Sequence, residues 1–195
     1  MLLLACYKLH LGAKINIDYH ALAPELIIIF TIVGALSLDL IFRRKNKYLI
    51  AIFSVVGTVA SLIPIITLWF SKETNRYLFE GSYVIDRFSL ILKGIFILAT
   101  YLTLVLSVKY IESEEYYQGE YYFLLLCSLL GAVVIASSRD LLILFIGIEL
   151  ASGPMFLLSG WKKGSPESNE GAIKFFLLGV LSAALILYGF SLLYG

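Results

Sequence analysis

The sequence predicts an all-α, polytopic membrane protein with about six transmembrane helices. Of its 195 residues, 60% are hydrophobic and only 15% are charged, whereas a soluble domain is about half apolar and about a quarter charged. The mean hydropathy is +0.91. Six stretches stay apolar over the length that a helix needs to cross a hydrocarbon core about 30 Å thick.

The first predicted span covers residues 24–42. Pro24 suits the first turn of a helix, and the Glu25 carboxylate in that turn interacts favourably with the helix dipole. Asp39 lies near the far end of the span, only four residues before Arg43. Its side chain is therefore close enough to the membrane edge to reach the interface.

The second predicted span covers residues 48–70. Gly57 and Ser61 are four residues apart, and small residues at this spacing let two helices approach closely. Pro64 has no backbone N–H to donate, so we expect it to kink the span.

A mixed-charge loop is predicted at residues 71–86, and the third span follows at 87–108. Lys93 lies about two turns inside that span. A lysine side chain can extend along a helix to the membrane surface, and we favour this interpretation over a role of Lys93 in transport. An acidic, tyrosine-rich loop at 109–119 leads to the fourth span at 120–137.

The fifth span, residues 141–158, contains an acid in the middle of an apolar stretch, Glu149. Glu149 is ten residues past Arg139, which places it roughly 15 Å deep, near the membrane midplane. A carboxylate at that depth costs a few kcal/mol unless it is protonated, paired or hydrated. Pro154 follows five residues later and cannot donate the hydrogen bond that the Leu150 carbonyl expects.

Two interpretations of Glu149 stay open. An ionisable residue inside a membrane helix is by default a functional one, which favours a protonatable group on an ion path. The alternative is an acid that pairs with a neighbouring helix for assembly only.

The connections around the last two spans are also informative. The turn between the fourth and fifth spans is very short, so these spans are expected to be antiparallel neighbours. Ser165 and Pro166 are a good N-cap and first helical residue for a sixth span that runs to about residue 194. In that span Glu170 precedes Lys174 by four residues, the favourable order for a helical ion pair. Lys174 is either partly buried and suited to proton exchange, or only the structural partner of Glu170.

Charge predicts the orientation of the chain and excludes several function classes. The dense basic clusters at 43–47 and 162–163 lie on the same side of a six-span topology, which the positive-inside rule assigns to the cytoplasm, with both chain ends outside. A net charge of +1 gives no basic surface for nucleic acid. Cys6 and Cys127 form no CxxC motif, and no nucleotide-binding or zinc-protease motif occurs. No catalytic or metal-ligating residue is expected on this chain.

Three blocks of the sequence resemble a known family. They are Ser137-Ser-Arg-Asp-Leu-Leu-Ile-Leu-Phe-Ile-Gly-Ile-Glu-Leu-Ala-Ser-Gly-Pro154, Glu170-Gly-Ala-Ile-Lys-Phe-Phe-Leu-Leu-Gly179 and Leu187-Tyr-Gly-Phe-Ser-Leu-Leu-Tyr-Gly195. Together they resemble the N subunit of proton-pumping NADH–quinone oxidoreductase (respiratory complex I), called subunit 2 in mitochondria and chloroplasts. Subunits of multisubunit cation/proton antiporters and membrane-bound hydrogenases are similar more broadly.

The resemblance implies proton translocation coupled to electron transfer from NADH to quinone, so the chain would be one subunit of a translocase. Glu149 matches the buried acid of the family's fifth helix, and Lys174 matches its sixth-helix lysine. A direct Glu149–Lys174 pair is a hypothesis of this comparison. Pro154, Glu170 and Asp140 lie in the matching blocks as supporting residues.

The resemblance also implies where the chain works. NADH, FMN, iron–sulfur clusters and quinone are expected on or between other subunits, with no cofactor on this chain. The partners would be the other membrane subunits of complex I and the lipid bilayer, most simply in a bacterial inner membrane. The alternatives are a subunit of a cation/proton antiporter or membrane-bound hydrogenase, or a non-transporting structural or assembly fragment.

The resemblance divides the chain into three parts. Residues 1–23 are expected to be an N-terminal segment, and 24–118 to be three transmembrane helices with their loops. Residues 119–195 would begin the proton-translocating, antiporter-like repeat, which is truncated here. The family's subunits are longer, with two inverted repeats that build a site at their interface, so we expect this chain to be an N-terminal portion.

Overall fold

A computed structural model describes residues 18–42, 47–71, 75–113, 119–162 and 164–194. Six helices in these ranges are long and apolar enough to cross a membrane, at Ala23–Ile41, Tyr48–Trp69, Arg87–Ile111, Gly119–Ser137, Leu141–Ser159 and Pro166–Tyr194. They coincide with the six predicted spans. The expectation of an all-α, multi-pass integral membrane protein is confirmed.

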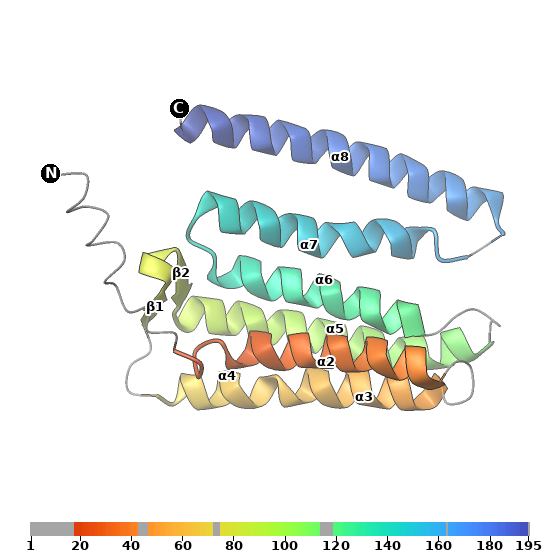
Figure 1. The fold of residues 1–195 in the computed structure, drawn as a ribbon, viewed down its shortest axis with the longest axis horizontal. Helices are drawn as coiled ribbons and strands as arrows, with labels where there is room; N and C mark the ends of the chain where they lie inside the picture. The colour runs from red at the N-terminus through yellow and green to blue at the C-terminus, as the bar shows by residue number, and fades with distance from the viewer. Residues whose placement is uncertain (1–17, 43–46, 72–74, 114–118, 163, 195) are drawn as a thin grey trace, which may run out of the picture.

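The described elements follow one another as a helical bundle with one small hairpin (Figure 1). They are α2 (Ala23–Phe42), α3 (Lys47–Ala60), α4 (Leu62–Trp69), β1 (Arg76–Leu78), the 3-10 turn η1 (Phe79–Gly81), β2 (Tyr83–Ile85), α5 (Arg87–Ser113), α6 (Gly119–Ser137), α7 (Leu141–Ser159) and α8 (Pro166–Tyr194).

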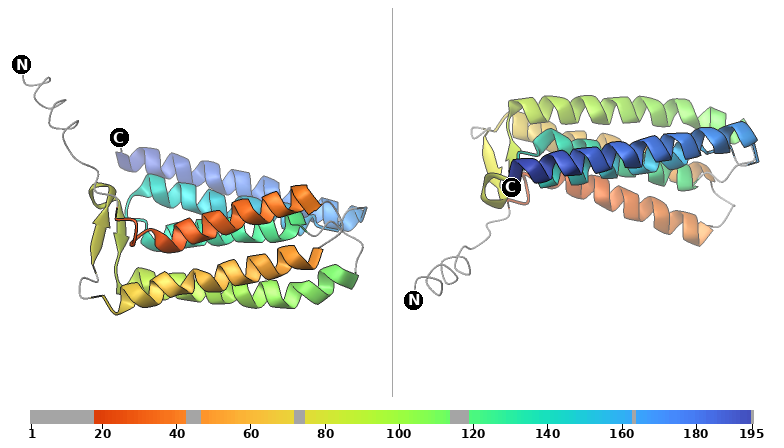
Figure 2. Two further views of the ribbon diagram at one scale, coloured as in Figure 1. Left: turned by 60° about the horizontal axis from the view of Figure 1, so that its bottom comes forward. Right: turned by 90° about the horizontal axis from the view of Figure 1, so that it is seen from above.

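The bundle is built around α6. This helix packs against α2, α3, α5 and α7, whereas α8 packs only against α7 among the described elements. The views in Figures 1 and 2 agree that α8 is the outermost helix. Burial decreases from the centre to the edge. In the most apolar 18 residues of each helix, 44% are buried in α6, 6% in α7 and 0% in α8. The core thus lies among α2–α6, and α7 and α8 form an edge.

The second span is interrupted as its proline predicts. Helix α3 ends at Ala60 and α4 begins at Leu62, with a turn at Ser61 between them. Pro64 lies in the first turn of α4, where its missing N–H costs least. The close approach expected at Gly57 is confirmed, since a Cβ there would lie 2.2 Å from the Thr31 hydroxyl of α2.

The prediction of a loop at residues 71–86 was wrong for residues 76–85. Strands β1 and β2 form an antiparallel hairpin that places Leu78 opposite Tyr83. The turn needs left-handed backbone at Phe79 and Glu80, with φ of 50° and 58°. Burial alternates along β2, because successive strand side chains point to opposite faces. A three-residue strand is too short for this alternation to stand out in the sequence.

The third span is longer than the predicted 87–108, because α5 continues as helix to Ser113. The residues Lys109-Tyr-Ile-Glu-Ser113 contain no glycine or proline to end it. The apolar stretch therefore predicts the part of α5 that crosses the membrane, but it does not predict the residue at which the helix ends.

The hairpin lies at the end of the bundle where the described chain begins and where α8 ends (Figure 1). The start of α2 and the end of α8 therefore lie at the same end of the bundle (Figure 1), as an even number of spans predicts. Which side faces the cytoplasm stays a prediction. The basic residues 43–46 lie outside the described residues, as does Cys6.

Helices α6 and α7 are antiparallel neighbours, as their short connection predicts. They approach so closely that a Cβ at Gly131 would lie 2.3 Å from the backbone nitrogen of Ala151. The Ser128 hydroxyl of α6 donates a hydrogen bond of 2.8 Å to the Ala151 carbonyl of α7. This tight seam fixes the helix that carries Glu149 against the core.

Candidate functional site

Glu149 lies midway along α7, as its sequence position predicts. Its side chain is half-buried at the edge of the bundle. Among the described residues, no hydrogen bond or ion pair to the Glu149 carboxylate is found. An acid at the middle of a membrane-spanning helix is thus left without a partner on the described part of the chain.

Pro154 lies inside α7, and the helix continues through it to Ser159. The proline has no N–H for the Leu150 carbonyl, one residue after Glu149. Nearby, the Ser152 hydroxyl bonds back to the Ile148 carbonyl at 2.8 Å, a contact that often bends helices. The acid therefore lies beside a turn of its helix that lacks one backbone hydrogen bond.

The predicted ion pair between Glu170 and Lys174 is present on α8, at 2.5 Å. Both side chains are well exposed, at 64% and 69%. Lys174 is exposed in the described structure, because no described helix other than α7 packs against α8, and its partial burial stays a prediction. Lys174 makes its ion pair with Glu170 and none with Glu149.

Asp140 holds the start of α7. Its side chain accepts a hydrogen bond of 2.7 Å from the backbone N–H of Leu142, which makes it the N-cap. The Tyr194 hydroxyl at the end of α8 donates to the same carboxylate at 3.3 Å. Asp140 therefore links the ends of the two edge helices, which is a supporting role. Ser165 likewise caps α8, accepting from the Ser168 N–H at 3.3 Å.

The structure contains a second polar site, which the sequence did not predict. Lys93 does not extend to the surface, and that prediction was wrong. Its side chain is fully buried, and its ammonium group donates to Glu25 Oε1 at 2.5 Å. Glu25 is only 5% exposed. The pair joins α2 to α5 inside the core.

Tyr83 completes this site from the hairpin. Its hydroxyl donates to the same Glu25 oxygen at 2.6 Å. Its ring centroid lies 5.2 Å from the Lys93 ammonium, within the range of a cation–π contact. Glu25, Lys93 and Tyr83, which we call the core triad, thus bring together one helix start, one strand and one helix interior.

Local structure explains how the core triad forms. Asp86 and Ser89 cap α5 reciprocally, since the Ser89 N–H donates to Asp86 Oδ1 at 2.7 Å and the Asp86 N–H donates to Ser89 Oγ at 2.9 Å. This cap fixes where α5 starts and therefore the height of Lys93. On β2, Tyr83 points inward and Val84 points away.

The hydroxyl of Tyr83 stays protonated at all ordinary pH values. Burial raises its pKa well above the usual value, and the charge of Glu25 and the hydrogen bond to it add to the shift. The neighbouring Ser137 hydroxyl acts in the opposite direction. Ser137 Oγ does not reach hydrogen-bond geometry, however, and is a buried hydroxyl without a hydrogen-bond partner on the described chain.

The sequence offered two signals for the core triad. Lys93 lies about two turns inside an apolar span, and Glu25 lies at the start of another. Which spans lie side by side is not readable from their apolar patterns, so the pair could not be assigned. No cluster of three or more His, Cys, Asp or Glu side chains suited to a metal occurs among the described residues.

Comparison with known proteins shows which proteins the chain is similar to. The family model described as "NADH:quinone oxidoreductase/Mrp antiporter, TM" matches residues 138–195. Over 186 residues the chain is 34% identical to the NAD(P)H-quinone oxidoreductase subunit 2 of Nostoc sp., a match that covers 95% of this chain and 35% of that protein. The NADH-quinone oxidoreductase subunit N of Methylovorus glucosotrophus is 35% identical over 181 residues, which are 93% of this chain and 37% of that protein.

Solved structures share the fold. A chain of respiratory complex I from Thermus thermophilus superimposes with a TM-score of 0.73 and 27% identity, over 88% of this chain and 36% of that chain. A chain of an archaeal membrane-bound sulfane sulfur reductase gives a TM-score of 0.78 over 90% of this chain and 37% of that one, at 21% identity. The chain spans about a third of the length of the relatives it matches. Over that third, it is similar to the membrane subunit of NADH–quinone oxidoreductase called subunit N or subunit 2.

Proposed function

We propose that the chain forms part of a proton-translocating membrane subunit of NADH–quinone oxidoreductase. The observation that carries this proposal is the similarity to subunits N and 2 along 93–95% of the chain. These relatives favour it over an antiporter, a hydrogenase or an assembly fragment. The enzyme's redox chemistry lies on other subunits, and NADH, FMN, iron–sulfur clusters and quinone are bound there.

Within this function, Glu149 is the proton-carrying group. It lies midway along α7, half-buried and without a partner among the described residues. A carboxylate at that depth is stabilised by taking up a proton, by pairing or by hydration. The freed Leu150 carbonyl beside it offers a further hydrogen-bond acceptor, which suits water at this level of the membrane.

Lys174 and Glu170 act with Glu149 once α8 is covered. The exposed face of α8 is apolar along most of its length, and the relatives are about three times as long as the match. We infer that further helices of the subunit or complex pack on this face. Their packing removes water from Lys174, which makes its charge depend strongly on nearby acids.

The remaining assignments follow from this proposal. Residues 119–195 begin the proton-translocating repeat, and 24–118 are the helices that precede it. The partners are other membrane subunits of the complex and the surrounding lipid. The membrane is the inner membrane of a bacterium.

Replacement of Glu149 tests the proposal. The intact subunit carrying Glu149→Gln is assembled into the complex and reconstituted into vesicles, and NADH-driven proton uptake is measured. We expect uptake to fall by about tenfold or more, because a positioned proton-transfer group contributes at least that much. Glu167→Gln, at an exposed acid in the first turn of α8, is the control. Wild-type uptake in the assembled Glu149→Gln complex contradicts the proposal.

A further inference from the structure

The core triad is a buried ionic site that the proposed Glu149 path does not use. Lys93 is fully buried and Glu25 is 5% exposed, yet both are ionisable. An ion pair inside the core loses the hydration of both charges and is a weak source of net stability. Its presence therefore invites a functional explanation.

The hydrogen-bonding capacity of the core triad is only partly used. Glu25 Oε1 accepts from both Lys93 and Tyr83. Its second oxygen, Oε2, is buried and accepts no hydrogen bond on the described chain. Three buried side-chain atoms have no hydrogen-bond partner among the described residues, and two of them lie at this site. They are Glu25 Oε2 and Ser137 Oγ, and Ser137 lies next to Tyr83.

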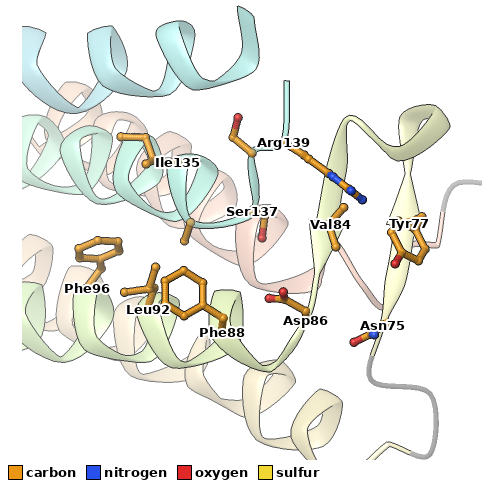
Figure 3. A pocket seen from close by; sticks show the side chains of 12 residues that line it. Asn75, Tyr77, Val84, Asp86, Phe88, Leu92, Phe96, Ile135, Ser137 and Arg139 are labelled. Carbon is orange, nitrogen blue, oxygen red and sulfur yellow. The ribbon is translucent and has the colours of Figure 1, made fainter. Parts of the chain in front are cut away.

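A pocket of about 590 Å³ opens beside these groups, between the hairpin and the ends of α5 and α6. Figure 3 shows its two parts. Phe88, Leu92 and Phe96 of α5 line the part that runs along the helices, and Asp86 and Arg139 lie at the hairpin. Ser137 lines the polar part of the same pocket. Its backbone neighbour Ser138 pairs with Tyr83 across a single bridge.

Ser137 lines the pocket and neighbours Tyr83, whose hydroxyl bonds to Glu25. Hydroxyl groups both donate and accept hydrogen bonds, so they can pass a proton along a chain. The order is pocket, Ser137, Tyr83 and then Glu25 Oε1, to which Lys93 also donates. Six residues separate Lys93 from Arg87 at the start of α5, so the site lies roughly 9 Å from that end.

We propose that the core triad is a second proton-exchange site, which opens to water at the hairpin end through Tyr83 and Ser137. A hydronium ion in the pocket gives its proton to Ser137, the Ser137 hydroxyl turns to hydrogen-bond Tyr83, and Ser137 and Tyr83 each pass one proton on. Glu25 gains one O–H bond, and a neutral water molecule stays in the pocket. Lys93 keeps its proton, and the reverse sequence returns the proton to the pocket.

The proposal goes beyond the proposed function, since the core triad shares no residue with the Glu149 region. Charged and titratable groups reach the carboxylate from two neighbouring elements, Lys93 of α5 and Tyr83 of β2. Asp86 and Arg139 border the pocket, where they set the potential at its mouth. The carboxylate and the ammonium belong to separate helices, so small helix movements change how strongly they interact.

Infrared spectroscopy of the intact complex in vesicles tests the proposal. As pH is lowered, we expect a carboxylic acid C=O band that is absent from Glu25→Gln. Tyr83→Phe keeps the ion pair but removes the phenol hydrogen bond, so it should shift this band and slow its appearance after a pH jump at least about tenfold. Tyr77→Phe, at an exposed tyrosine of β1, is the matched control and should change neither.

The outcomes separate this proposal from the proposed function. If no carboxylic acid band responds to Tyr83→Phe across the pH range in which the complex stays assembled, the core triad is a permanent ion pair and the proposal is wrong. Tyr83→Phe decides this even where Glu25→Gln fails to assemble. Proton uptake by Glu149→Gln is measured separately in the same vesicles and can fail or succeed independently.

Discussion

Two glutamate–lysine pairs of this chain have the same length and opposite surroundings. Glu25–Lys93 and Glu170–Lys174 both measure 2.5 Å. The side chains of the first pair are 7% and 0% exposed, and those of the second are 64% and 69% exposed. Distance therefore does not distinguish a core ion pair from an edge ion pair, but burial does.

The two pairs also differ in the number of helices that surround them. The first pair lies among α2 and α5 in the core, where neighbouring elements fix both groups. The second lies on α8, which has one neighbouring helix among the described elements. The core pair is enclosed by described helices, whereas the edge presents an apolar face to lipid or to further helices.

The largest expected effect is on the core pair. Lys93→Met leaves the Glu25 carboxylate buried without its partner and should lower the free energy of unfolding by about 3–5 kcal/mol. Lys174→Met, at the edge, should cost only about 0.3–0.5 kcal/mol, the usual value of a helical i,i+4 pair. Reversible denaturation of each variant in detergent micelles measures both changes in the free energy of unfolding.

The double variant Glu25→Leu plus Lys93→Met sharpens this prediction. Replacing both charges with apolar groups of similar size is often neutral, so stability should return close to the wild-type value. A double variant as unstable as Lys93→Met would mean that packing, and not the unpaired charge, causes the loss.

A pair of glycines tests the same contrast through packing. Gly131→Ala puts a Cβ 2.3 Å from the α7 backbone, so it should open the α6–α7 seam and cost about 1–3 kcal/mol. Gly171→Ala meets nothing within 4 Å on α8 and should stabilise the helix by about 0.4–1 kcal/mol. Thermal unfolding of the two variants against wild type measures both. Equal destabilisation would show that the edge is packed as tightly as the core.

The smallest expected effect is at the hairpin, where Asp18 forms an ion pair with Arg76. Burial raises the pKa of Asp18, but the hydrogen bond and charge of Arg76 and two backbone N–H groups outweigh it, so the net pKa lies below 3.8. The stabilisation is therefore present above pH 3.8 and is lost as pH falls through the lower, folded-state pKa. Asp18→Asn should lack this acid-dependent part in unfolding curves recorded against pH. A variant that loses stability below pH 3.8 as wild type does would place the effect on other carboxylates.

Much of the fold was readable from the sequence. All six spans, the break near Pro64, the capped start of α8 and the antiparallel α6 and α7 follow from local rules on apolar length, proline and caps. These features depend on residues close together in the chain. The hairpin did not follow, because three-residue strands carry too few residues for a pattern.

The site was only partly readable for the same reason. The depth of Glu149 and the Glu170–Lys174 spacing are local, and the structure places both as expected. The core triad joins residues 58 and 68 positions apart. Such a contact depends on which helices are neighbours, and no periodic pattern in an almost uniformly apolar helix specifies this.

The most direct test of the account is the number of protons pumped per NADH oxidised by complexes that carry Glu149→Gln. Assembly is checked on native gels, and the ratio is compared with that of wild type and of Glu167→Gln in the same vesicles. The account predicts that the ratio or the coupled rate falls sharply for Glu149→Gln alone. An assembled Glu149→Gln complex that pumps at the wild-type rate and ratio would contradict it.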